Sequence, residues 1–186
     1  MHRDDGTLWL ASRHARSPES WHTAQGRTND CGPHAAALAI NFWHGEPRTD
    51  PHALARMMNR PRLGPGLIPL VVRRIPHWAT FPWGIVDVLR QQGIAARWRF
   101  FAAEEQLHRA LAEDRLALVI FGEPLRRKGR LRWAGWSHVA LLVGWNPAAQ
   151  TYWFVDSAQS RVPYPRPRDD FRRLWANLGR ILIEMR

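Results

Sequence analysis

The only cysteine of the chain stands where the sequence predicts the start of a helix. Ala35 to Phe42 consists of strong helix formers and apolar residues, and Asn29 and Asp30 are residue types that cap a helix start. Cys31 is therefore expected at a helix N-terminus, where free backbone N–H groups and the helix dipole favour a thiolate. A nucleophile needs this position. A buried structural cysteine is the alternative, since free cysteine is among the most buried residue types, and the segment alone leaves both open.

The residues around the cysteine are compatible with a nucleophile but do not decide between the two interpretations. Gly32 leaves no side chain beside the sulfur, and Pro33 is tolerated in a first helical turn, where its missing N–H has no intrahelical partner. Gln25 lies upstream and is able to present an amide N–H to the oxyanion that forms when a thiolate attacks a carbonyl. His34 is expected at the surface or on the wall of a cleft, and it is a poor second choice for a catalytic base.

Two later stretches supply a base and an acid. Residues 136 to 145 have the pattern of an apolar strand that begins near His138, and residues 151 to 157 have that of a second strand ending on Asp156. The segment between them carries the residue types of a hairpin turn. An antiparallel hairpin returns Asp156 to the end of the sheet where His138 lies, so the sequence predicts a nucleophile, a base and a group that orients the base at one site.

These motifs resemble a known family. Asn-Asp-Cys-Gly-Pro behind an upstream glutamine, then Ser-His-Val-Ala-Leu-Leu-Val-Gly and Phe-Val-Asp-Ser-Ala, are similar to the papain-like bacteriocin-processing peptidases, the double-glycine leader (C39-like) family and its stand-alone relatives. The resemblance spans residues 25 to 183. It implies a cysteine peptidase with Cys31 as nucleophile and His138 as general base and acid. It further implies Asp156 as the residue that orients the histidine and Gln25 as the oxyanion donor.

The order of the motifs limits which related families apply. Ubiquitin-like protein proteases also carry a glutamine before Asp-Cys-Gly, but they have their histidine and aspartate upstream of the cysteine, whereas here both follow it. Transporter-linked members of the double-glycine family continue into membrane helices and an ATP-binding domain. This chain has neither, which indicates a stand-alone member and removes the basis for expecting a Gly-Gly leader as substrate.

Two alternatives to a peptidase remain at this point. An acyltransferase of the same fold would form the same acyl-enzyme and resolve it with an amine, and the motifs do not separate the two. A catalytically silent peptide-binding module would have no need to keep all four of Gln25, Cys31, His138 and Asp156, so their joint presence argues against it. Either enzyme would act through an acyl-enzyme on a peptide or protein substrate.

The length of 186 residues favours one domain over residues 21–186, preceded by an N-terminal arm over residues 1–20. Helical patterns come first and strand patterns last, so we expect an α+β papain-like fold: an N-terminal helical part carries the cysteine and a C-terminal antiparallel sheet carries the histidine and the aspartate. No apolar run is long enough to span a membrane, and no signal peptide is visible. A cytoplasmic protein is expected, and a single cysteine is compatible with a reducing compartment.

The net charge of +11 comes almost wholly from arginine, because Lys128 is the only lysine. An excess of positive charge of this size is compatible with nucleic acid or an acidic substrate as a partner. The arginines are scattered and no nucleic-acid recognition motif is present, so nucleic acid is not the expected partner. No motif indicates a metal or another cofactor, since the histidines do not pair with cysteine or with each other at ligand spacing.

Residues beside the catalytic motifs are the candidates for substrate binding. Trp136 and Ser137 directly precede His138. Residues 122–135 are expected to form a basic loop over the active site, in which Arg126, Arg127 and Arg130 recruit an acidic peptide or hold a carboxylate. A solvated hairpin is the plainer interpretation of this charge run.

The remaining segments predict the rest of the fold. Residues 59–82 are rich in proline and glycine, which indicates a long loop that is either a wall of the substrate groove or a surface excursion. Alternation over residues 94–101 predicts a half-buried strand with Phe100 on the inner side. Asp169 and Asp170 are expected to cap a short helix after a connector over residues 161–168. Further helices are expected over residues 49–58, 83–92, 103–114 and 171–178, and further strands over 116–121 and 180–184.

Overall fold

The computed structural model describes residues 6–10, 17–64, 70–128 and 132–186, with the backbone alone given over 125–128 and 132–134. Its helices are α1 (Cys31–His44), α2 (Pro51–Asn59), α3 (Pro82–Gln91), α4 (Glu104–Ala112) and α5 (Arg168–Asn177), with a 3-10 turn η1 (Pro18–Trp21). Its strands are β1 (Leu8–Trp9), β2 (Arg62–Leu63), β3 (Leu70–Val71), β4 (Arg74–Ile75), β5 (Ala79–Thr80), β6 (Ala96–Arg99), β7 (Ala117–Lys128), β8 (Arg132–Asn146), β9 (Thr151–Val155), β10 (Tyr164–Pro167) and β11 (Ile181–Met185).

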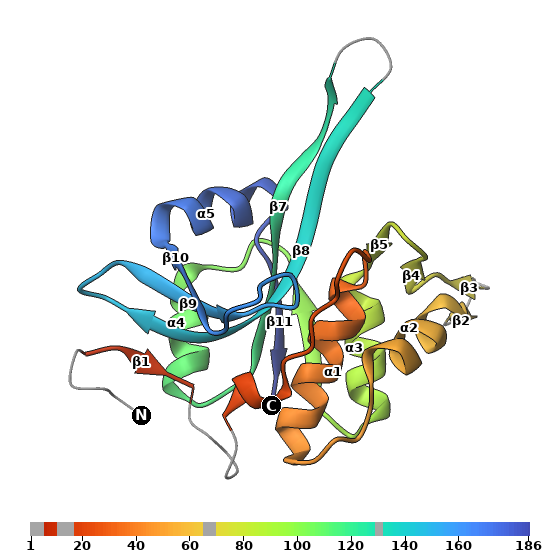
Figure 1. The fold of residues 1–186 in the computed structure, drawn as a ribbon, viewed down its shortest axis with the longest axis horizontal. Helices are drawn as coiled ribbons and strands as arrows, with labels where there is room; N and C mark the ends of the chain where they lie inside the picture. The colour runs from red at the N-terminus through yellow and green to blue at the C-terminus, as the bar shows by residue number, and fades with distance from the viewer. Residues whose placement is uncertain (1–5, 11–16, 65–69, 129–131) are drawn as a thin grey trace.

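The main sheet is antiparallel and has the order β10-β9-β8-β7-β11-β6. Strand β1 pairs with Gly144 and Trp145 near the C-terminal end of β8, beyond Leu142, which pairs with the first residue of β7. Helices α1, α2 and α3 gather on one side of this sheet, and α4 and α5 lie on the other side (Figure 1). The α+β class expected from the sequence is confirmed, with the cysteine on the helical side and the histidine and aspartate on the sheet side.

The core explains why α1 carries so few polar residues. Every residue from Gly32 to Phe42 is buried, because the helix packs against other helices on one side and against β8 on the other. The strands that face it are equally apolar, with Leu118, Val119, Ala140 and Leu141 almost wholly buried. A helix that is apolar all round is stable only inside a core, so α1 is held at the centre of the molecule with its first residue at one end.

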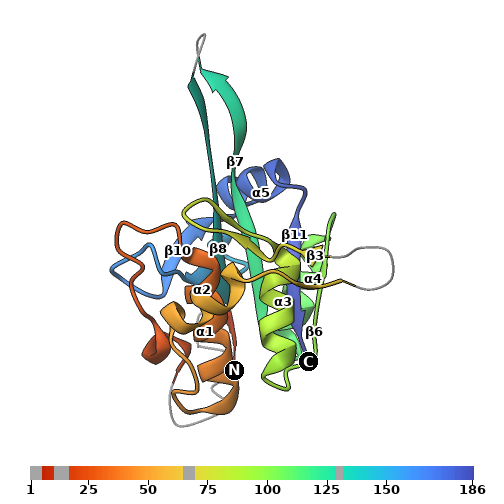
Figure 2. The same cartoon turned by 90° about the vertical axis from the view of Figure 1, so that its right-hand side faces the viewer.

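The basic segment over residues 122–135 differs from the predicted loop. Strands β7 and β8 continue through it as one long antiparallel hairpin, which projects beyond the rest of the protein in both views (Figures 1 and 2). The pairing shifts register between Glu123 and Arg126. Pro124 lies in that interval, and proline donates no hydrogen bond to a ladder, which is a common cause of a bulge. The ladder resumes after the bulge, which agrees with the hairpin alternative and not with an irregular loop.

The segment over residues 59–82 is also more ordered than the predicted loop. It contains two small two-stranded sheets, β2 with β3 and β4 with β5, and its last residue already belongs to α3. The β4–β5 hairpin lies at the N-terminal end of α1 (Figure 1). We refer to residues 60–81 as the insert.

Three smaller predictions were wrong. The connector before α5 contains the edge strand β10, which pairs with β9. Helix α5 begins at Arg168, so Asp169 and Asp170 lie in its first turn, where a carboxylate also complements the helix dipole. Strand β6 ends at Arg99; alternation therefore no longer applies to Phe100, which is 48% exposed and packs on the edge of Trp98.

Part of the N-terminal arm packs on the sheet. Leu8 and Trp9 pair with β8, and the backbone N–H of Leu10 donates to the carbonyl of Val143 at 2.8 Å. Among the described residues, no helix is long and apolar enough to cross a membrane.

Candidate active site

Cys31 is the first residue of α1, as the sequence predicts. Asp30 occupies the N-cap position, and its backbone carbonyl accepts the N–H of His34 at 3.0 Å. Its carboxylate makes no capping hydrogen bond and contacts Arg74 instead. The N–H groups of the first turn therefore have no carboxylate on them, and the partly exposed thiol lies at the positive end of the helix.

The sheet brings His138 and Asp156 together. His138 lies within β8 opposite Phe121 of β7, and Asp156 follows directly after β9, which pairs with the other edge of β8. The Nε2 atom of His138 contacts the Oδ1 atom of Asp156. Both residues are buried, the aspartate at 2% exposure.

Cys31 completes this group from the helical side. Its side chain is hydrogen-bonded to the imidazole of His138, and Nδ1 is the ring nitrogen left for it because Nε2 is taken by Asp156. Burial lowers the pKa of His138, but the hydrogen bonds and charges of Asp156 and Cys31 outweigh it and raise the pKa to about 9. The imidazole is therefore held as a cation at neutral pH, which favours an ion pair with the sulfur.

Asp156 is fixed by further contacts. Its Oδ1 accepts the backbone N–H of Ala158 at 2.8 Å, and its backbone carbonyl is 3.0 Å from Nε2 of His22. Its charge adds to the effect of burial on Tyr164, whose pKa rises to about 12. The carboxylate thus has one oxygen engaged by both an imidazole and a backbone amide.

Gln25 lies on the loop before α1 and is tied to the same region of the sheet. Its backbone N–H donates to the carbonyl of Ser157 at 2.9 Å, and the Ser157 hydroxyl donates to Oε1 of Gln25 at 2.8 Å. Its Nε2 donates to the carbonyl of Thr28 at 2.9 Å. A primary amide carries two N–H hydrogens, and this contact uses one of them. The four predicted catalytic residues thus come from two loops, one helix start and one strand.

His34 was expected at the surface or on a cleft wall, and that prediction was wrong. It is 5% exposed, and its Nδ1 lies 2.9 Å from the hydroxyl oxygen of Thr23 and 3.0 Å from the Thr23 carbonyl. Burial lowers its pKa despite the hydrogen bond to Thr23 and the charge of Asp30. A buried, neutral imidazole that holds a loop is a structural residue.

A groove of about 310 Å³ is lined by near neighbours in sequence of Cys31 and His138, although none of the four predicted catalytic residues lines it. Trp136 and Ser137, the predicted substrate-binding residues that precede His138, both line it. Asn29 lines it from the loop before Cys31, and Trp78 lines it from the insert. A larger hollow of about 440 Å³ lies between α4 and α5 and contains none of the predicted site residues.

The three predicted basic residues are not all described. Arg126 and Arg127 lie in β7, paired with Ala134 and Trp133, and Arg130 lies outside the described residues. The backbone of Arg126 and Arg127 belongs to the projecting part of the hairpin (Figure 1). Their contribution to substrate binding stays a prediction.

The sequence analysis missed two residues of this site. Ser157 did carry a signal, since a hydroxyl beside the predicted triad aspartate is placed for a second hydrogen bond in the site. Arg74 gave no signal, because it is one of many scattered arginines and its partner lies in another segment.

The described residues contain no cluster of three or more His, Cys, Asp or Glu side chains able to hold a metal ion. The arrangement offers acyl-transfer chemistry instead: a thiol at a helix start, an imidazole that reaches it, and a carboxylate behind the imidazole.

No protein-family model matches this chain, and no curated protein matches its sequence. Its fold is similar to that of a crystal structure from Bacillus anthracis described as a "putative C39-like peptidase", with a TM-score of 0.66 over 89% of this chain and 93% of the other. The two sequences are 13% identical. The likeness therefore concerns the fold, and the fold is compatible with that of a C39-like peptidase.

Proposed function

We propose that this protein is a cysteine peptidase that cleaves a peptide bond through Cys31, His138 and Asp156. The observation that carries the proposal is the hydrogen-bonded row of thiol, imidazole and carboxylate at the N-terminus of α1. A cysteine with a purely structural role does not require a buried imidazolium that is itself paired with a carboxylate. The likeness in fold to a structure described as a C39-like peptidase supports the same class.

The proposed reaction begins with the Cys31 thiolate, which attacks the carbonyl carbon of the scissile bond. The oxyanion accepts hydrogen bonds from the backbone N–H of Cys31 and from the second amide hydrogen of Gln25. His138 then gives its Nδ1 proton to the leaving amine, and the C–N bond breaks to leave an acyl-enzyme. A water molecule passes a proton to His138 as it attacks the thioester, which releases the carboxylic acid and regenerates the thiolate.

The proposed substrate is a peptide or a protein segment lying in the groove beside these residues. Two exposed indoles line the groove, Trp78 from the insert and Trp136 from β8. Exposed indoles in a concave site provide contact area for extended chain segments. We further propose that Arg126, Arg127 and Arg130 select an acidic peptide.

Alkylation of the single thiol tests the proposed ion pair. Iodoacetamide labelling followed by intact mass should be fast at pH values well below 8.5, where an ordinary thiol is mostly protonated. His138→Ala should slow it to ordinary behaviour at the same pH. Equal and slow labelling of both proteins would contradict the proposal.

Cleavage itself is tested with a complex peptide library and mass spectrometry. New termini should appear with the wild type and not with Cys31→Ala. Addition of a primary amine separates hydrolysis from acyl transfer, since an acyltransferase would give amide products in place of free acids. Peptide binding without any product from either assay would indicate a silent binding module.

A further inference from the structure

Asp30, the residue before the proposed nucleophile, carries a negative charge that would disfavour a thiolate at Cys31. Asp30 is the N-cap of α1, and aspartate at this position ordinarily accepts hydrogen bonds from the first free N–H groups of the helix. The start of this helix is proposed to stabilise the thiolate and the oxyanion. Pro33 has no N–H and the N–H of His34 already donates to the Asp30 carbonyl, so a capping carboxylate would accept the Gly32 N–H, next to the Cys31 N–H. It would also place a like charge beside the sulfur.

Arg74 of β4 holds this carboxylate elsewhere. Its guanidinium contacts Oδ1 of Asp30 through one nitrogen and donates to Oδ1 of Asn59 at 2.9 Å through another. The side chain of Arg74 is 3% exposed and that of Asp30 is 16% exposed. A buried pair with an additional hydrogen-bond partner is fixed in direction, unlike an ion pair at the surface.

The insert also touches the residues on both sides of this pair. The amide of Asn29 donates to the carbonyl of His77 at 2.6 Å. Gly32 approaches Thr80 so closely that a Cβ atom at position 32 would lie 2.4 Å from the Thr80 Cβ. Residues 29, 30 and 32 therefore each contact the β4–β5 hairpin.

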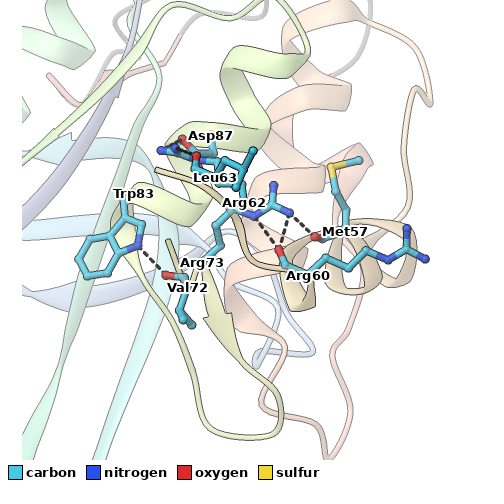
Figure 3. A network of polar contacts seen from close by, with 8 residues as sticks. All are labelled: Met57, Arg60, Arg62, Leu63, Val72, Arg73, Trp83 and Asp87. Carbon is cyan, nitrogen blue, oxygen red and sulfur yellow. Dashed lines mark hydrogen bonds and ion pairs between the residues drawn. The ribbon is translucent and has the colours of Figure 1, made fainter. Parts of the chain in front are cut away.

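The insert is itself anchored to the helices behind it. Figure 3 shows Arg73, which donates to the carbonyls of Met57 and Arg60 at the end of α2, and Trp83, which donates to the carbonyl of Val72. Arg62 contacts Asp87 of α3 in the same network. The hairpin thus has a fixed base from which to hold the start of α1.

We infer that Arg74 is a positioning residue for the nucleophile: it draws the Asp30 carboxylate away from the N-terminus of α1 and compensates its charge. The N–H groups of Cys31 and Gly32 then carry no capping carboxylate, and no uncompensated negative charge lies beside the sulfur. This inference rests on the proposed function of Cys31. It assigns to the insert a part in the chemistry in addition to its place in the groove wall.

Other charged groups near Cys31 bear on any test by titration. His138 reaches the sulfur from β8 with Asp156 behind it, and His34 lies on the same helix and interacts with Asp30. Arg74 contacts Asp30 and Asn59, so its substitution removes no contact of His138 or Asp156. Substitution of Asp30 also removes the charge that interacts with His34, and the double variant, compared with Asp30→Asn, shows what Arg74 contributes once that charge is gone.

The experiment is the pH dependence of iodoacetamide labelling in four proteins: wild type, Arg74→Met, Asp30→Asn and the double variant. Arg74→Met should raise the pH midpoint of labelling by about one unit, as expected for an uncompensated like charge nearby. The double variant should return it to near the wild-type value, since it removes the carboxylate charge as well. Asp30→Asn alone should lower the midpoint, because it leaves an uncompensated cation.

A purely structural salt bridge gives a different pattern. It would shift Arg74→Met and the double variant equally, or shift neither, and either result would overturn the inference. Arg73→Met is the matched control, because it removes a buried guanidinium of the insert that contacts backbone carbonyls and no carboxylate among the described residues. It should lower the unfolding temperature and leave the midpoint in place.

Two features keep the outcome decisive. If Arg74→Met fails to fold, Asp30→Asn in the native background still gives a downward or an absent shift, and an absent shift counts against the inference. The inference is read from differences between variants, whereas the proposed function is read from the wild-type midpoint and its response to His138→Ala. The inference and the proposed function can therefore be contradicted independently of each other.

Discussion

The two halves of the candidate site are built by different means. On the sheet side, His138 and Asp156 are placed by backbone pairing, since β8 is hydrogen-bonded to β7 on one edge and to β9 on the other. On the helical side, the turn before Cys31 is irregular and is placed by side-chain contacts with the insert, chiefly Asp30 with Arg74 and Asn29 with the carbonyl of His77.

The two halves should therefore respond differently to substitution. A ladder of backbone hydrogen bonds is nearly independent of which side chains it carries, so the sheet side should keep its geometry through most substitutions and lose only the chemistry of the group removed. A turn held by a few polar contacts loses its geometry when one contact is removed. Substitutions on the two sides should therefore separate into losses of chemistry and losses of position.

The largest effect is expected on the sheet side. His138→Ala should reduce kcat/KM by about 10²–10⁴-fold, the usual contribution of a general acid and base. The protein should stay folded with a lower unfolding temperature, because the buried Asp156 carboxylate loses its imidazolium partner. Peptide cleavage and thermal unfolding of the same samples measure the two quantities. His44→Ala is a control, since that half-buried imidazole contacts the carbonyl of Gln92 at the other end of α1. A collapse of the fold in His138→Ala would break the distinction drawn between the halves.

Gln25 joins the two halves and should give the next largest effect. Gln25→Ala should lower kcat by about 10²–10³-fold, as loss of an oxyanion donor does in other acyl-transfer sites. Ser157→Ala removes only the hydroxyl that holds Oε1, so a loss of about tenfold is expected, well below that of Gln25→Ala. Gln91→Ala, at the exposed end of α3, is the matched control. A larger loss for Ser157→Ala than for Gln25→Ala would contradict the assigned roles.

The pH dependence of kcat/KM reports the contact between the two halves, because His138 interacts with both Asp156 and Cys31. The hydrogen bonds and charges of Asp156 and Cys31 overcome the effect of burial and raise the pKa of His138 to about 9. His138 therefore keeps the proton for the leaving amine below this pH and loses it above, so kcat/KM should fall about tenfold per pH unit beyond about 9. Asp156→Asn removes one cause of the raised pKa and should move this falling limb to lower pH. A limb that stays in place in Asp156→Asn would contradict the assignment.

The same contrast explains what the sequence could predict. Apolar periodicity and turn residues are local signals, and they were sufficient for the α+β class, for the start of α1 at Cys31 and for a strand at His138. The start of that strand was wrong, since β8 begins at Arg132 and not near His138. The Asp30–Arg74 contact joins residues of two irregular segments, and no local pattern encodes it. For residues 122–135 the sequence left a loop over the active site and a solvated hairpin as alternatives, and pairing that resumes beyond Pro124 gives the hairpin.

A smaller effect is expected from crowding the helical side. Gly32→Ala would put a Cβ atom 2.4 Å from the Thr80 Cβ. Overpacking of this kind costs about 1–3 kcal/mol, measured as the free energy of unfolding in denaturant, and it should also lower kcat because the nucleophile turn moves. Thr80→Gly in the same chain should recover much of both losses. Recovery of stability without recovery of kcat would show that the position of the turn does not depend on this contact.

The smallest effect is expected in the groove, where both halves contribute a wall. Trp78→Ala and Trp136→Ala should each raise KM several-fold and leave kcat nearly unchanged, because a wall that contacts ground state and transition state alike provides uniform binding. Phe101→Ala is the matched control, since that ring is 76% exposed and does not line the groove. Trp78 belongs to the hairpin that holds Asp30, whereas Trp136 belongs to the ladder. If Trp78→Ala alone also lowers kcat, the insert transmits changes in its own packing to the nucleophile, and the helical half depends on it more strongly than through a single ion pair.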